Sequence, residues 1–223
     1  MSDDGTRATE YAILIDEVSR VIASRIEEAE LPLHVLLSSP FGTLNENQEE
    51  LLTAARDALD AADVEIRRLR SLLALDRGAM HADPCPIALT ELLKPALAIV
   101  EGGARTRHVT IQRRIDPSAA RAIVDAVHVQ PALTTLLTDV VSRIPTGHDV
   151  EIAATDSGKG RIRITAHHPS ATPPGNDTTL DLRLAQRLIA MQDGTVLRTT
   201  TETRIELPSE VPTRVLARSD TDA

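Results

Sequence analysis

Apolar residues recur every three or four positions between Thr9 and Leu75, the spacing that gathers them on one face of an α-helix. The second half of this region has a seam with alternating steps of three and four, at Leu52, Ala55, Leu59, Ala62, Ile66, Leu69 and Leu73. Such a heptad seam predicts a helix that packs against a partner helix. An earlier stripe predicts a first helix, with Ile15, Val18, Ile22, Ile26, Ala29, Leu33 and Leu36 on its apolar face.

A run of helix-breaking residues from Ser38 to Gly42 separates the two stripes, and acidic residues from Glu46 to Glu50 suit the first turn of the second helix. Two helices joined by a short loop form an antiparallel hairpin. A hairpin buries only part of two long stripes, and two copies paired as a four-helix bundle cover the rest. We therefore expect a homodimer. The alternative is a monomer whose hairpin packs on the second half of its own chain.

After Pro86 the pattern changes to helical stretches that alternate with short β-branched runs. We expect helices at 89–101, 128–143 and 180–191, and strands at 109–115, 150–154, 161–166, 195–198 and 203–207. This order predicts an α+β fold, in which a long helical hairpin is followed by an α/β layer sandwich. The expected domains are residues 1–81 and 82–208, with a mobile tail at 209–223.

The composition argues against a nucleic-acid partner. The chain has 24 basic and 33 acidic side chains, and only one Tyr, one Phe and no Trp. Phosphate-backbone affinity comes mainly from Lys and Arg, and single-strand binding uses aromatic platforms. The lone Cys85 excludes an internal disulfide, and no apolar run approaches the roughly 18 residues that span a bilayer. We expect a cytoplasmic protein without membrane insertion.

Several segments, in their order and spacing, resemble the catalytic core of bacterial sensor histidine kinases. Glu30-Leu-Pro-Leu33 resembles the R-T-P-L that ends the family's phospho-acceptor box, and 44–51 its inter-helix loop and second-helix start. Residues 86–93 resemble the entry to its ATP-binding half, and 180–191 the helix after its second glycine box. The likeness runs from about residue 20 to 208 and implies a dimerisation hairpin followed by an ATPase-like domain.

The phospho-acceptor histidine of that family is missing. Alignment of the H-E-L-R-T-P-L box on Pro32 places Glu27 where the histidine belongs. A carboxylate there cannot form the phosphoramidate. His34 lies two helical turns later on the same face, but no acid follows it, so an ordinary surface or bundle histidine is the favoured interpretation.

The nucleotide boxes are altered as well. The asparagines that hold Mg²⁺ in the family fall on Thr135 and Asp139, of which only Asp139 is a possible Mg²⁺ ligand. Asp177 and Asp181 stand where the family has glycines, which give phosphate access to the amides at a helix start. Their carboxylates would repel a triphosphate.

Residues 167–171 lack the Asp and Gly of the adenine box. Asp156-Ser-Gly-Lys-Gly160 matches that box literally, but its place between two strand patterns predicts a hairpin turn. We expect no ATP or Mg²⁺ cofactor.

Other charged clusters have simpler interpretations. His167 and His168 are adjacent at a strand end and should point to opposite faces, so no metal site is expected. Arg67, Arg68 and Arg70 form a small basic patch late in the second helix, where cations complement the helix dipole.

These features together predict a catalytically degenerate histidine-kinase-like dimer that acts by protein binding in two-component signalling. The resemblance implies docking of a response-regulator receiver domain on the hairpin, around Glu27, Glu28, Leu31 and His34. One alternative is a divergent active kinase or phosphotransferase that uses His34 and a pocket around Asp139. Another is a partner that forms heterodimers with an intact histidine kinase through the seam from Leu52 to Leu73.

Overall fold

The protein is described by a computed structural model that covers residues 2–38, 42–116, 121–168 and 179–210, with the side chains of residues 2–10 left undescribed. The chain forms two compact units, Met1–Met80 and His81–Ala223. The expected tail falls almost entirely outside the described residues. No helix in the described ranges is long and apolar enough to cross a membrane.

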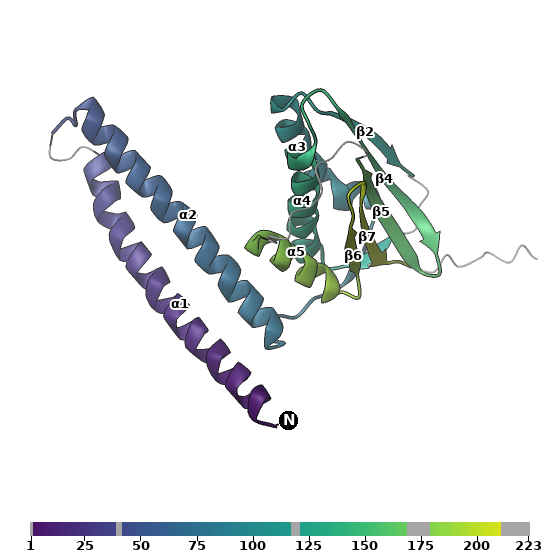
Figure 1. Ribbon diagram of the computed structural model, residues 1–223, viewed down its shortest axis with the longest axis horizontal. Helices are drawn as coiled ribbons and strands as arrows, with labels where there is room; N and C mark the ends of the chain where they lie inside the picture. Colours follow the sequence, from purple (N-terminus) through teal and green to yellow (C-terminus); the bar gives the residue numbers. More distant parts are fainter. Residues whose placement is uncertain (1, 39–41, 117–120, 169–178, 211–223) are drawn as a thin grey trace, which may run out of the picture. The chain divides into compact units, whose positions relative to one another are not determined.

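The first unit is a helical hairpin of α1 (Ser2–Leu37) and α2 (Glu46–Asp76) (Figure 1). A capping box fixes the start of α2: the Asn45 side chain accepts from the Gln48 amide at 2.9 Å, and the Gln48 side chain accepts from the Asn45 amide at 3.0 Å. At the opposite end of the hairpin, Arg77 and Asp16 form an ion pair at 3.1 Å. The two predicted helices are confirmed, although α1 begins well before Thr9.

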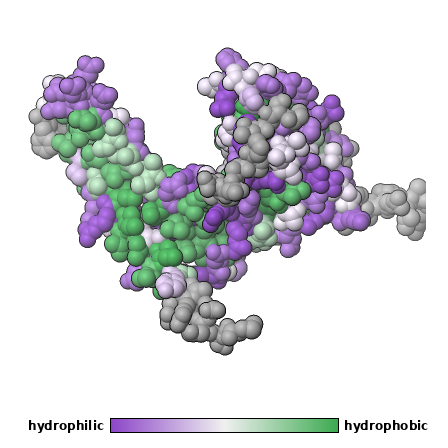
Figure 2. All heavy atoms as spheres, viewed as in Figure 1, coloured by the Kyte–Doolittle hydropathy of each residue, from purple (hydrophilic) through white to green (hydrophobic). Residues whose placement is uncertain are grey.

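The apolar seam of α2 is partly buried in the hairpin. Leu73 is buried, and Leu52, Leu59, Ile66 and Leu69 are half-buried. On α1, by contrast, Ile26 is buried but most of the predicted stripe is not. The large apolar side chains of α1 that stay exposed within one chain are Tyr11, Ile13, Leu14, Ile15, Val18, Val21, Ile22, Leu31 and Leu36. Figure 2 shows apolar surface gathered along the hairpin.

The second unit is a two-layer α/β sandwich. Its elements are β1 (Cys85–Ile87), α3 (Leu89–Thr106), β2 (Thr110–Ile115), β3 (Ala122–Val124), α4 (Ala126–Arg143), β4 (Asp149–Gly158), β5 (Arg161–His167), α5 (Leu180–Ala190), β6 (Thr195–Arg198) and β7 (Glu202–Pro208). The sheet order is β2-β4-β5-β7-β6, with β2 and β4 parallel and the other pairs antiparallel. The helices α3, α4 and α5 cover one face of this sheet (Figure 1).

The core between these layers is built almost entirely from Leu, Ile, Val and Ala, as the lack of aromatic residues requires. Leu133, Leu136 and Leu137 of α4 and Ile164 of β5 are among the side chains that are almost completely inaccessible to solvent. The α+β fold class is thus confirmed. The turn predicted at Asp156–Gly160 is also confirmed, because β4 and β5 form an antiparallel hairpin there. The short pair β1 and β3 was not predicted.

Candidate functional site

Two sets of predicted residues each line a cavity, one in each unit. In the hairpin, Glu27, Leu31 and His34 are spaced by four and three residues along α1, which places them on one stripe. They line an open cavity of about 380 Å³ together with Glu30 of α1 and with Arg56 and Asp60 of α2. Glu28 does not line this cavity; its carboxylate binds Arg25 at 2.6 Å on the helix surface.

The hairpin cavity combines charged groups with an exposed leucine. Leu31 is 68% exposed, and three carboxylates and one imidazole surround it. Arg56, the cation of the set, pairs with the neighbouring Asp57 at 3.1 Å. An open, mixed surface of this kind suits the docking of a protein better than the enclosure of a small ligand.

In the second unit, the three described residues of the predicted nucleotide slot lie together. Thr135 and Asp139 of α4 and Asp181 of α5 line a cavity of about 310 Å³. Asp177 lies outside the described residues. The N-cap of α5 is Thr179, whose hydroxyl accepts from the Leu182 amide at 3.4 Å, and Asp181 lies in the first turn of the helix. An acid in that turn complements the positive end of the helix dipole, where an anionic ligand would otherwise be favoured.

The carboxylate of Asp139 is engaged by two arginines. Its Oδ2 atom accepts from Arg143 Nε at 3.1 Å and from Arg198 Nη2 at 2.8 Å. Both arginine side chains are only 11% exposed, and that of Asp139 is 17% exposed. Arg143 belongs to α4, one turn after Asp139, whereas Arg198 ends β6. The pairing therefore ties the helix layer to the sheet, and it occupies the only acidic group among the predicted Mg²⁺ positions.

Arg198 was missed by sequence reasoning. It follows Asp139 by 59 residues, and no spacing or motif connects the two. Only the sheet order, which brings the end of β6 against α4, could have revealed the contact.

The two adjacent histidines point in opposite directions, as predicted. His167 is exposed, while His168 is fully buried, with Nε2 lying 3.5 Å from the Thr203 hydroxyl. Burial lowers the pKa of His168, and the positive charge of Arg143 lowers it further. Among the described residues, no group of His, Cys, Asp and Glu is placed to hold a metal ion.

Replacement of Asp139 by alanine should lower the free energy of unfolding of the second unit by about 3 kcal/mol, because two mostly buried guanidinium groups each lose an ion-pair partner. Urea unfolding followed by circular dichroism measures this loss. The matched control is Glu151→Gln, which breaks the more exposed pair with Arg114 and should cost less than about 1 kcal/mol. Equal losses in the two variants would contradict a structural role for Asp139.

No protein-family model matches the sequence. The sensor protein FixL of Bradyrhizobium diazoefficiens is 29% identical over 121 residues, which cover 48% of this chain and 23% of that protein. The chain thus spans less than a quarter of the length of this curated relative.

Two solved structures share the fold over most of the chain. Full-length ShkA, crystallised in complex with AMPPNP, matches with a TM-score of 0.69 and 18% identity, over 86% of this chain and 46% of that one. The histidine kinase AdeS of Acinetobacter baumannii matches with a TM-score of 0.60 and 11% identity, over 83% of this chain and 95% of that one. The chain therefore has the fold of a histidine-kinase core, a helical hairpin followed by an ATPase-like domain.

Proposed function

We propose that this chain is a catalytically degenerate histidine-kinase-like protein that acts by binding receiver domains in two-component signalling. The observation that carries this proposal is the state of Asp139, whose carboxylate bridges Arg143 and Arg198. Mg²⁺ needs oxygen ligands that are free to face it, and it keeps near-ideal octahedral geometry. Two guanidinium groups on its Oδ2 atom neutralise much of the charge of Asp139, and they would place positive charge beside any Mg²⁺ bound there.

The remaining groups of the slot support the same conclusion. Thr135 offers a hydroxyl where the kinase resemblance implies an amide, and Asp181 adds a negative charge at the start of α5. A triphosphate would meet this charge at short range, and Coulomb repulsion would oppose its binding. We therefore propose that the second unit does not use ATP as a substrate.

The hairpin cavity supplies the proposed docking surface. Leu31 provides an exposed apolar contact, and Glu27 provides a fixed negative charge at the position where the resemblance implies a phosphorylatable histidine. One carboxylate has less charge than a phosphoryl group, so its contribution would be steering and orientation of the receiver.

The apolar stripe of α1 supports the proposed homodimer. Tyr11, Val18 and Ile22 are 64%, 48% and 41% exposed in the single chain. They share a stripe on α1 that is separate from the side where the buried Ser19 and Ile26 lie. A second copy of the hairpin, packed as a four-helix bundle, would cover them.

A second candidate function is phosphotransfer through His34. The specific observation in its favour is that the imidazole shares a cavity with the carboxylates of Glu27, Glu30 and Asp60. Carboxylates close to an imidazole can orient it and assist proton transfer. Acid-labile label on the protein after incubation with a phosphorylated receiver, absent from His34→Ala, would establish this function in place of simple docking.

Calorimetric titration with Mg·ATP should give no saturable heat, at protein concentrations that detect a dissociation constant of about 1 mM, or about −4 kcal/mol. ShkA, which was crystallised with AMPPNP, is the positive control. Saturable binding of Mg·ATP to the folded chain would contradict the proposed loss of nucleotide use.

At least one receiver domain from a purified panel encoded in the same genome should bind the full chain without nucleotide. Replacement of Leu31 by alanine should weaken binding about tenfold, because an anchoring leucine contributes about 1.5 kcal/mol or more when buried. Interferometry with immobilised receiver measures the change. The matched control is Ile99→Ala, which truncates a 60% exposed apolar residue of α3.

Two outcomes would contradict docking at this surface: binding by no receiver, or unchanged binding of Leu31→Ala. The role of the Glu27 charge is tested separately, because Glu27→Gln should weaken binding as much as Glu27→Ala does. If only the alanine variant loses affinity, the side chain acts through its shape and not through its charge.

Replacement of Val18 by aspartate should convert the dimer to a monomer, since it places a charge inside the proposed bundle. Size-exclusion chromatography with light scattering measures the mass, and circular dichroism confirms that the helices persist. Ser24→Asp, on an exposed position away from this stripe, should remain dimeric. A monomeric wild-type chain would contradict homodimerisation, and mixed dimers with a co-expressed intact kinase would favour the heterodimer instead.

A further inference from the structure

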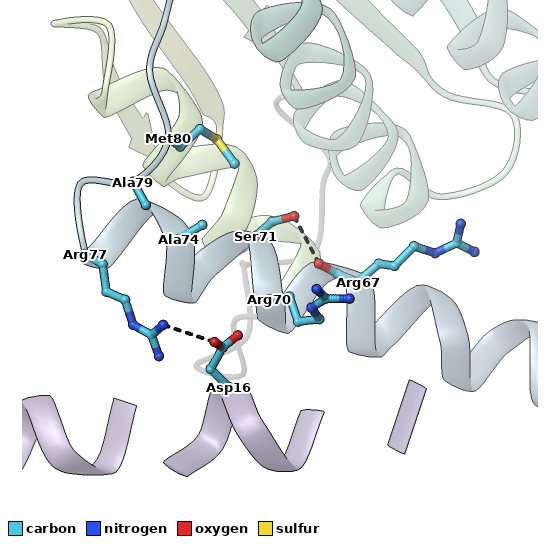
Figure 3. A pocket seen from close by; sticks show the side chains of 8 residues that line it. All are labelled: Asp16, Arg67, Arg70, Ser71, Ala74, Arg77, Ala79 and Met80. Atoms are coloured by element: carbon cyan, nitrogen blue, oxygen red, sulfur yellow. Dashed lines mark hydrogen bonds and ion pairs between the residues drawn. The ribbon is translucent and has the colours of Figure 1, made fainter. Parts of the chain in front are cut away.

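A cavity rich in arginine lies at the end of the hairpin where α2 finishes. Its volume is about 450 Å³, and its lining includes Arg67, Arg70 and Arg77 with Asp16 of α1 (Figure 3). The three arginines are spaced by three and seven residues, so they share one side of α2. The cavity lies wholly within the first unit and is separate from the proposed receiver surface.

The three guanidinium groups differ in how they are neutralised. Arg77 is paired with Asp16 at 3.1 Å and also donates to the Ala12 carbonyl, and Arg67 is paired with Asp63. Arg70 forms no hydrogen bond or ion pair within the described part of the chain, and its side chain is drawn without a partner in Figure 3. The cavity therefore keeps an excess of positive charge.

This arrangement is unfavourable for the hairpin by itself. Residues 63, 70 and 77 recur every seven positions beside the apolar seam at 52, 59, 66 and 73, but they are polar. Arg67 and Arg77 each have a carboxylate partner, so the uncompensated charge within the described residues is that of Arg70, and the long polar side chains leave open space beside the seam. An anion bound beside Arg70 would neutralise this guanidinium and occupy the cavity (Figure 3).

We propose that this cavity binds a small organic phosphate. A guanidinium offers a planar fork that matches phosphate oxygens, and a phosphomonoester has a charge of about −1.5 to −2 at pH 7. The volume exceeds the needs of inorganic phosphate and falls within the range of small-molecule sites. Ala74 and Met80 provide apolar lining for the organic part.

Occupation of the cavity would also affect the chain that joins the two units. Met80 lines the cavity and is the last residue of the first unit, directly before His81. A ligand that contacts Met80 would restrict this connection. The site would thus give the hairpin a means to respond to a small molecule.

The test is isothermal titration of the full chain with phenyl phosphate, which combines a phosphomonoester with a small apolar group. We expect saturable binding that is tighter than for inorganic phosphate and absent for phenol. Arg70→Gln should weaken binding at least tenfold, because it removes a charge-assisted contact without breaking an ion pair of the protein. Arg183→Gln, which removes an exposed arginine of α5, should bind as the wild type does.

A second variant separates binding from folding. Asp16→Asn removes the negative charge from the lining and releases Arg77, so it should bind phenyl phosphate several-fold more tightly. A purely structural effect on the hairpin would not improve binding. The proposal is overturned if the folded wild type binds none of the phosphates, if Arg70→Gln binds equally well, or if citrate binds as tightly as phenyl phosphate.

Discussion

Two packed helices bury only the sides that face each other, and this constraint governs the first unit of the protein. The stripe of α1 is wider than the side that α2 covers: Ile26 is buried, whereas Val18 and Ile22 remain about half exposed. Apolar area left in water forgoes roughly 25 cal/mol for each Å². Association would stabilise a long hairpin with this pattern, and the bundle proposed above would supply the missing contacts.

In the second unit the decisive interaction is electrostatic. Two guanidinium groups that are 11% exposed need a counter-charge, and Asp139 provides it for both. Both contacts use the Oδ2 atom, and two guanidinium groups beside one carboxylate largely neutralise its charge, which weakens its attraction for a metal ion. The position that the kinase resemblance assigns to metal binding thus forms a structural contact between α4 and β6.

Most elements could be predicted because their signals are local. The heptad seam and the acids after Asn45 defined α2, and the Gly-bearing turn at Asp156–Gly160 defined the β4–β5 hairpin. The strands β1 and β3 have three residues each, too few for a periodic pattern, and β1 includes a proline. The contact of Asp139 with Arg198 depends on the sheet order. The basic residues at 67–70 do not form one patch, because Arg67 and Arg70 line a cavity while Arg68 pairs with Glu65. Residue contacts that depend on the tertiary structure cannot be predicted from the spacing of residues in the sequence.

The two cavities of the hairpin are related through the geometry of α1. Asp16 and Glu27 are eleven residues apart, which is close to three full turns, so both lie on the same side of the helix about 16 Å apart. A receiver at Glu27 and an anion beside Asp16 would therefore contact one rigid element without competing for space. Val18 and Ile22, the residues assigned to the proposed dimer interface, lie between them in the sequence but on roughly the opposite side of the helix. The proposed bundle would therefore contact α1 away from both proposed sites, and the helix itself would be the physical connection among the three surfaces.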